Sequence, residues 1–215
     1  MRKNYSGNEC GFALTAIMVV VALIAVIGAY MAFSNRDSAS ATSQNTAKVL
    51  ASTIINEAAT IRGGSDKLQA NGIAVGQITM DTTANTGIYD PVNGGCPVQY
   101  PPAAALVTTT NTWVYKISGA SPNYAATVKL ENVGTAGNDQ YLIVLPDVTY
   151  AVCQQINNAL YGNTTINTAD SALASWTTAS TAIDASGDAA INGRVEQCIK
   201  TSDGHYVYYK TTLEQ

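Results

Sequence analysis

The feature that most constrains this chain is an uncharged, proline-free run of twenty-two residues, Phe12–Phe33. An α-helix rises 1.5 Å per residue, so this run would extend roughly 33 Å, enough to cross a bilayer core of about 30 Å. Arg2 and Lys3 precede the run, whereas Arg36 and Asp37 follow it and nearly cancel each other. The positive-inside rule therefore predicts a cytoplasmic N-terminus and places the bulk of the chain outside the cytoplasm.

Two other interpretations of the apolar run stay open. A cleaved secretory signal peptide has an apolar region of about 7–15 residues, followed by small residues at the cleavage site. The Ser-Ala-Ser-Ala stretch at 38–41 could serve as such a site, but the run is longer than that class requires. An uncleaved signal anchor is the second alternative, and it would hold the rest of the chain at the membrane.

An amphipathic segment, 34–64, follows the apolar run. Apolar residues recur in it at spacings of three and four, which is the pattern of one helix face: Ala47, Leu50, Ala51, Ile54, Ala58 and Ile61. Gly63 and Gly64 come next, and glycine commonly ends a helix. The sequence therefore predicts one continuous helix from about Phe12 to Arg62, with two helices broken near Ser34–Asn35 as the alternative.

Downstream of this helix, alternating and polar stretches predict an α+β head built on an antiparallel β-meander. The expected strands are 112–118, 125–133, 140–145 and 205–213, and the expected helix is 150–161, ended by Gly162. We expect the amphipathic half of the long helix to cover one face of this sheet. Residues 163–192 are low in complexity and predict a surface excursion, with Trp176 holding it to the head.

The composition limits the function classes. Only 12% of the 215 residues are charged and the net charge is -4, so the chain lacks the basic surface of a nucleic-acid-binding protein. Its one histidine, His205, falls in an expected strand, and no GxSxG, HExxH, P-loop or CxxC motif occurs. Four aspartates could supply oxygen ligands to calcium, but their spacing fits no EF-hand: Asp139, Asp147, Asp184 and Asp188. We therefore expect neither an enzyme nor a metal or cofactor site.

The N-terminus resembles that of type IV prepilins. A short basic leader ends in Gly11, and Phe12 opens the apolar run. In that family a membrane peptidase cuts after this glycine, and the new N-terminal amine is methylated. Other segments resemble type IVb pilins in family order: the turn 89–97 (YDPVNGGCP), with Asp90 in place of the usual asparagine, the helix 148–160 and the closing segment 193–211.

This resemblance implies a division of the chain into a leader 1–11, a filament-core half-helix 12–33, an amphipathic half-helix 34–64 and a globular head 65–215. Subunits of that family pack their apolar half-helices together, which here assigns packing to Phe12, Ala16, Val20, Ala25 and Gly28. Ala16 stands where the family usually has glutamate, so the choice between a major and a minor subunit stays open.

Four cysteines bear on the fold. Cys10 leaves with the leader if the chain is cut after Gly11. The other three, Cys96, Cys153 and Cys198, allow three single pairings, between which the sequence alone does not choose. The resemblance implies the pair Cys153–Cys198, which would close the region 153–198. Cys96 is then either a buried thiol, which we expect, or an intermolecular contact.

We therefore expect a structural subunit of a type IV pilus-like filament, either a pilus or a secretion pseudopilus. It would be processed by a prepilin peptidase, reside in the bacterial inner membrane, and then polymerise through the pilus assembly machinery into a filament on the cell surface, alone or with other subunits. The alternative is an uncleaved, membrane-anchored binding domain in the periplasm or at the surface; an anchored periplasmic hydrolase is a more distant third. Cleavage after Gly11 distinguishes the first two.

Overall fold

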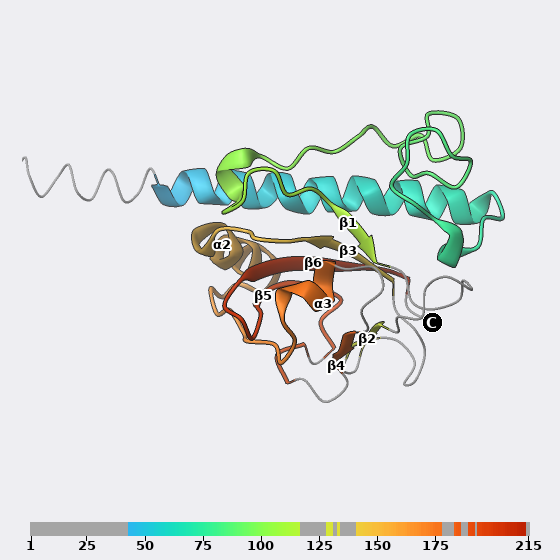
Figure 1. Ribbon diagram of the computed structural model, residues 1–215. Helices are drawn as coiled ribbons and strands as arrows, with labels where there is room; N and C mark the ends of the chain where they lie inside the picture. Colours follow the sequence, from blue (N-terminus) through green and yellow to red (C-terminus); the bar gives the residue numbers. More distant parts are fainter. Residues whose placement is uncertain are drawn as a thin grey trace, which may run out of the picture. The chain divides into compact units, whose positions relative to one another are not determined.

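The computed structural model describes residues 43–116, 128–130, 133, 141–177, 183–185, 189–191 and 193–213. Its architecture is α+β, as the sequence predicts: a helix over 43–70, called the long helix below, precedes a four-stranded antiparallel sheet (Figure 1). The other elements are η1 (Val75–Gln77), η2 (Ala103–Ala105), α2 (Tyr150–Tyr161), α3 (Leu173–Thr177) and a separate pair of short strands, β2 (Val128–Leu130) and β4 (Ile183–Ala185).

The long helix buries one stripe of its surface. The stripe follows a spacing of four and three residues, and its buried apolar members are Ala47, Ala51, Ile54, Ala58, Ile61 and Leu68. Ser65 continues the same stripe and is also fully buried. The predicted helix face is therefore confirmed, with Leu50 only partly buried at its border.

The predicted end of the helix at Gly63 and Gly64 is wrong, because the helix continues to residue 70. It ends two residues later in a Schellman motif, with Gly72 in the left-handed region at φ 85°. The Gly72 N–H donates to Gln69 O (2.9 Å) and the Ile73 N–H donates to Leu68 O (3.1 Å). These are the two hydrogen bonds that define that motif.

Gly64 has a packing role instead. A Cβ at this position would lie 2.8 Å from Ile88 Cγ2 and 2.9 Å from Cys96 Cβ, closer than side chains approach. At Gly63 a Cβ would meet nothing within 4 Å. The glycine at 64 thus lets the segment that carries Ile88 and Cys96 lie directly against the helix.

The sheet has the strand order β1-β3-β6-β5, and every pairing in it is antiparallel. Its strands are β1 (Val114–Lys116), β3 (Tyr141–Leu145), β5 (Glu196–Lys200) and β6 (Tyr206–Leu213). The predicted meander is wrong, since β2 does not lie between β1 and β3 but pairs with β4 in parallel. Alternation along a strand shows which residues share a face, but it carries no information about the pairing partner.

Both faces of the sheet are covered, whereas the sequence predicted one. On β3, Tyr141, Ile143 and Leu145 belong to the core beneath the long helix and α2, and Leu142 and Val144 belong to a second core. The second core includes Ala169, Trp176 and Ile191 from the segment predicted as a low-complexity excursion. In Figure 1 the sheet accordingly lies between the long helix and α3. A segment poor in apolar residues is thus held by a few large buried ones.

The helix predicted at 150–161 is confirmed as α2. It ends where expected, because Gly162 adopts φ 69° and its N–H donates to Asn158 O. Glycine takes this left-handed conformation without the steric cost that other residues meet. This helix brings its buried face, which includes Val152, Cys153 and Ile156, onto the core shared with the long helix.

Candidate functional site

The predicted processing and filament-packing residues lie outside the described part of the chain: Gly11, Phe12, Ala16, Val20, Ala25 and Gly28. The apolar run 12–33 falls there too. Within the described ranges, no helix combines the length and apolar character needed to cross a membrane.

The predicted disulfide is confirmed. Cys153 of α2 is bonded to Cys198 of β5, with Cα atoms 5.3 Å apart and both residues fully buried. Cys96 is the free cysteine among the described residues and is buried, as expected. Burial raises the pKa of its thiol, so at neutral pH it is protonated and a weak nucleophile.

Asn157, one helical turn after Cys153, reinforces the disulfide. Its Nδ2 donates to Cys198 O (2.8 Å) and to Thr165 O (2.8 Å), and its Oδ1 accepts from the Cys198 N–H (2.9 Å). The side chain is fully buried. Sequence analysis did not identify this residue, although an asparagine on the apolar face of a helix was a usable signal.

The outer edge of β5 is closed by such contacts. The Tyr161 hydroxyl donates to Glu196 O, Asn157 holds Cys198, and the backbone of Lys200 pairs with Asn167 O and the Ala169 N–H. The bonded cysteines are buried and the edge that carries Cys198 is already paired within the chain, which removes a site for strand addition.

The turn 89–97 that resembles the type IVb motif is built around Asp90. Its Oδ1 accepts from the Val92 N–H (3.1 Å), its Oδ2 accepts from Asn93 Nδ2 (2.6 Å), and its carbonyl accepts from the Gly95 N–H (2.6 Å). Because the Asn93 and Val92 donors favour the charged carboxylate, they hold the pKa of Asp90 below its usual value, with the Asn93 side-chain bond the largest cause. The turn places Cys96 against the long helix at Gly64.

A polar chain links the long helix to the sheet beneath it. Buried Ser65 bonds the Tyr115 hydroxyl (3.1 Å), which bonds Thr212 Oγ1 (3.3 Å) in turn. Nearer the N-terminus of the helix, the Trp113 Nε1–H donates to Glu57 Oε2 (3.0 Å). Burial raises the pKa of Glu57 and of Tyr115, with these hydrogen bonds partly offsetting the effect. The contacts fix how the helix is rotated on the sheet.

A buried tyrosine and an ion pair lie together on the strands β5 and β6. Glu196 accepts from the Tyr208 hydroxyl (2.5 Å) and from Lys210 Nζ (2.7 Å). Burial, and then the nearby Glu196 carboxylate, raise the pKa of Tyr208 well above its ordinary value. Tyr208 also packs edge-to-face on Trp113, with ring centroids 5.9 Å apart. We therefore assign this arrangement to stability, since its polar groups bond one another.

Asp147 forms a second polar cluster, which we call the Asp147 latch. Its Oδ1 lies 2.5 Å from His205 Nδ1, and its Oδ2 accepts from Thr108 Oγ1 (3.2 Å) and Asn111 Nδ2 (3.0 Å). The carboxylate is buried. Among the described residues, Asp147 is the one residue other than glycine that has a positive φ, at 55°. Residues in this strained region are enriched at functional sites. The Pro146-Asp147 dipeptide after a strand was the signal in the sequence.

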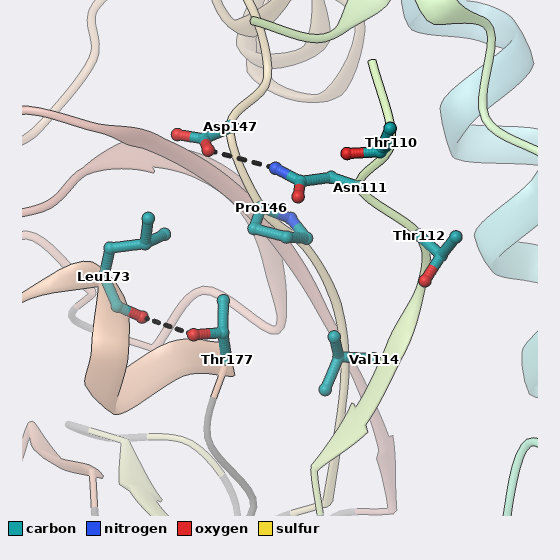
Figure 2. Close-up of a pocket in the computed structure, with 8 residues that line it drawn as sticks. All are labelled: Thr110, Asn111, Thr112, Val114, Pro146, Asp147, Leu173 and Thr177. Carbon is teal, nitrogen blue, oxygen red and sulfur yellow. Dashed lines mark hydrogen bonds between the residues drawn. The ribbon is translucent and has the colours of Figure 1, made fainter. Parts of the chain in front are cut away.

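An open cleft of about 280 Å³ adjoins the latch. Figure 2 shows its lining: residues 110–112 and Val114 on one side, Leu173 and Thr177 of α3 on the other, and Pro146 and Asp147 between them. The lining thus combines hydroxyl and amide groups with apolar side chains. The lining can therefore offer both hydrogen bonds and apolar contact to a small molecule.

The structure describes some of the remaining candidate residues that the sequence suggested. His205 was expected within the last strand, but it lies just before β6, is half-exposed and pairs with Asp147. Trp176 is fully buried and stacks on Tyr209, which confirms its holding role. Asp139 and Asp188 lie outside the described residues. Across the described ranges, no three His, Cys, Asp or Glu side chains gather in a way that could hold a metal ion.

Comparison with known proteins finds no match for this chain. No protein-family model matches this chain, and no curated protein or solved structure matches it either. The assignment of function therefore depends on the residues themselves.

Proposed function

We propose that this chain is a structural, non-catalytic subunit of a type IV pilus-like filament. It is cut after Gly11 at the cytoplasmic face of the inner membrane, and the mature chain begins at methylated Phe12. Subunits then leave the membrane by bundling their apolar half-helices, and the heads face outward at the cell surface. The partners are other filament subunits, the prepilin peptidase and the pilus assembly machinery.

The observation that carries this proposal is the long helix. Over 43–70 it is amphipathic and buries one stripe on an antiparallel sheet, and the uncharged run Phe12–Phe33 precedes it in the sequence. A filament subunit needs both parts, because one stretch packs against neighbouring subunits while the other anchors the head. An ordinary membrane anchor requires only the apolar run.

Two further features support the proposal. The disulfide Cys153–Cys198 joins a helix to the penultimate strand, and the final strand β6 enters the middle of the sheet. A disulfide of this kind suits an oxidising compartment outside the cytoplasm. That compartment agrees with the topology expected from Arg2 and Lys3.

The processing step gives the test. The full chain is produced in a bacterium that carries a prepilin peptidase, and the intact mass of the membrane and surface forms is measured. We expect a chain that starts at Phe12 with one added methyl group, and an unprocessed chain for Gly11→Val. Gly7→Val is the matched control, since it places the same side chain in the leader away from the junction; it should be processed normally.

The outcomes separate the two candidate functions. A surface-exposed chain that still begins at Met1 would reject the filament subunit and favour the uncleaved membrane-anchored binding domain. Equal processing of the Gly11→Val and wild-type chains would also reject the proposed junction.

A further inference from the structure

The cleft beside the Asp147 latch has features that a filament subunit does not require. The latch joins three separate parts of the chain, because Asp147 is held by Thr108 and Asn111 from one loop and by His205, which lies just before β6. The Val107 N–H adds a backbone bond to Asp147 O (2.7 Å). One wall of the cleft is therefore ordered before any ligand arrives, which lowers the entropic cost of binding.

The cleft also presents polar atoms that are not used within the fold. The hydroxyls of Thr110 and Thr112 and the side-chain oxygen of Asn111 make no hydrogen bond to the rest of the described chain. Thr177, by contrast, donates to Leu173 O (3.2 Å). Asp147 accepts three hydrogen bonds, and a carboxylate has about four acceptor sites, so one remains for a ligand.

Charge narrows the class of ligand. Asp147 is the one charged side chain among the lining residues that the structure describes, and its partner His205 is not one of those lining residues. An anion would meet a carboxylate and no lining cation, so it is disfavoured. A purely apolar ligand would strip water from the free hydroxyl and amide groups without replacing those hydrogen bonds, which is also unfavourable.

The lining fits a polyhydroxylated ring. Sugar hydroxyls both donate and accept, which matches threonine hydroxyls, an asparagine side chain and the spare site on a carboxylate. Pro146, Val114 and Leu173 supply apolar surface for the C–H face of such a ring. We propose that this cleft binds a neutral sugar, whose hydroxyls donate to the Asp147 carboxylate and the Asn111 side-chain oxygen and exchange a hydrogen bond with the Thr112 hydroxyl.

The test is a titration of the full chain, kept in a zwitterionic detergent that contains no sugar. Glucose, galactose, mannose and N-acetylglucosamine are added singly while backbone amide signals are followed by NMR, with phosphate and choline as charged probes. We expect at least one sugar to shift signals of residues 110–114 and 173–177, in a saturable way, and the charged probes to leave them unmoved.

Matched variants locate the site. Thr112→Val keeps the side-chain shape, removes no hydrogen bond of the latch, and should weaken sugar binding about tenfold, the equivalent of one hydrogen bond. Thr60→Val is the control, since its hydroxyl bonds Asn56 O on the exposed side of the long helix; it should bind as the wild type does. Asn111→Ala should weaken binding further.

Three results would overturn the proposal: no saturable shift with any of the sugars, shifts that map elsewhere, or unchanged binding by Thr112→Val. Displacement of the same signals by phosphate or choline alone would equally reject a neutral sugar. The outcome does not depend on cleavage after Gly11, so this proposal and the filament proposal fail separately.

Discussion

The Asn157 side chain makes two hydrogen bonds to the backbone of Cys198, donating to its carbonyl at 2.8 Å and accepting from its N–H at 2.9 Å. It therefore stands in for a neighbouring strand at the edge of β5, one turn of α2 away from the disulfide. A covalent bond and a buried amide thus join the same two elements.

Replacing Asn157 with alanine should destabilise the head by about 2–4 kcal/mol, because it leaves the buried N–H and C=O of Cys198 without partners. Asn158→Ala is the matched control: it lies on the same helix, and only its backbone carbonyl takes part in the cap at Gly162. Urea unfolding of the full chain in detergent, followed by circular dichroism, measures both. Equal midpoints for the two variants would contradict the role of Asn157.

Loss of the disulfide should also destabilise the head. Cys153→Ser or Cys198→Ser opens a loop with a sequence separation of 45, for which the chain-entropy model gives roughly 4 kcal/mol. Cys96→Ser removes no cross-link and should cost less, since only a small buried side chain changes. Unfolding under non-reducing conditions gives the stabilities, and peptide mapping without reduction checks the pairing. A dominant linked peptide that contains Cys96 would contradict the structure.

Two adjacent glycines in the long helix should respond in opposite directions to alanine. Gly64→Ala forces a methyl group to within 2.8 Å of Ile88 and 2.9 Å of Cys96, so we expect a loss of about 1–3 kcal/mol. Gly63→Ala meets nothing within 4 Å and should stabilise the helix by about 0.5–1 kcal/mol. Thermal unfolding of both variants provides the comparison. If Gly64→Ala were the more stable of the two, the close packing of 88–96 on the helix would be refuted.

Alkaline pH should unfold the head through its buried tyrosines. Burial raises the pKa of Tyr208 well above 10 and that of Tyr89 to about 12. The folded state therefore holds these protons more tightly than the unfolded state, whose tyrosines titrate near 10. Stability is retained below about pH 10 and falls as the pH rises beyond it.

A pair of phenylalanine variants isolates this effect. Tyr208→Phe removes one such proton, so the loss of unfolding free energy between neutral and alkaline pH should become smaller. Tyr100→Phe is the control because Tyr100 is 75% exposed; it should leave that difference unchanged. Urea unfolding over a series of pH values, with phenolate absorbance as a second signal, measures it. An identical pH dependence in both variants would contradict the assignment.

Much of the fold could be predicted from local patterns in the sequence. The stripe from Ala47 to Ile61, the helix 150–161 with its terminal Gly162, and the burial of Cys96 followed from periodicity, turn chemistry and the apolar character of a thiol. Each of these depends on neighbours in the sequence or on one side chain. The disulfide pairing came from family resemblance and not from spacing.

Non-local relations could not be predicted in the same way. The pairing of β1 with β3, and of β2 with β4, depends on contacts between distant segments. Gly64 resembled a helix stop because its true constraint, the approach of Cys96, lies far along the chain. The Asp147 latch and its cleft likewise join residues from 108 to 205, so no single stretch of sequence reveals them.

The most direct test of the central claim is electron microscopy of surface filaments from cells that produce the wild-type chain, Val20→Asp or Val20→Leu. Val20 lies within the uncharged run, and an aspartate there would be buried in a bundle of apolar helices without a partner. We expect filaments labelled by antibody to this chain for the wild type and Val20→Leu, and none for Val20→Asp, with the head still folded. Normal labelled filaments from Val20→Asp, or a wild-type chain found only in the membrane, would contradict it.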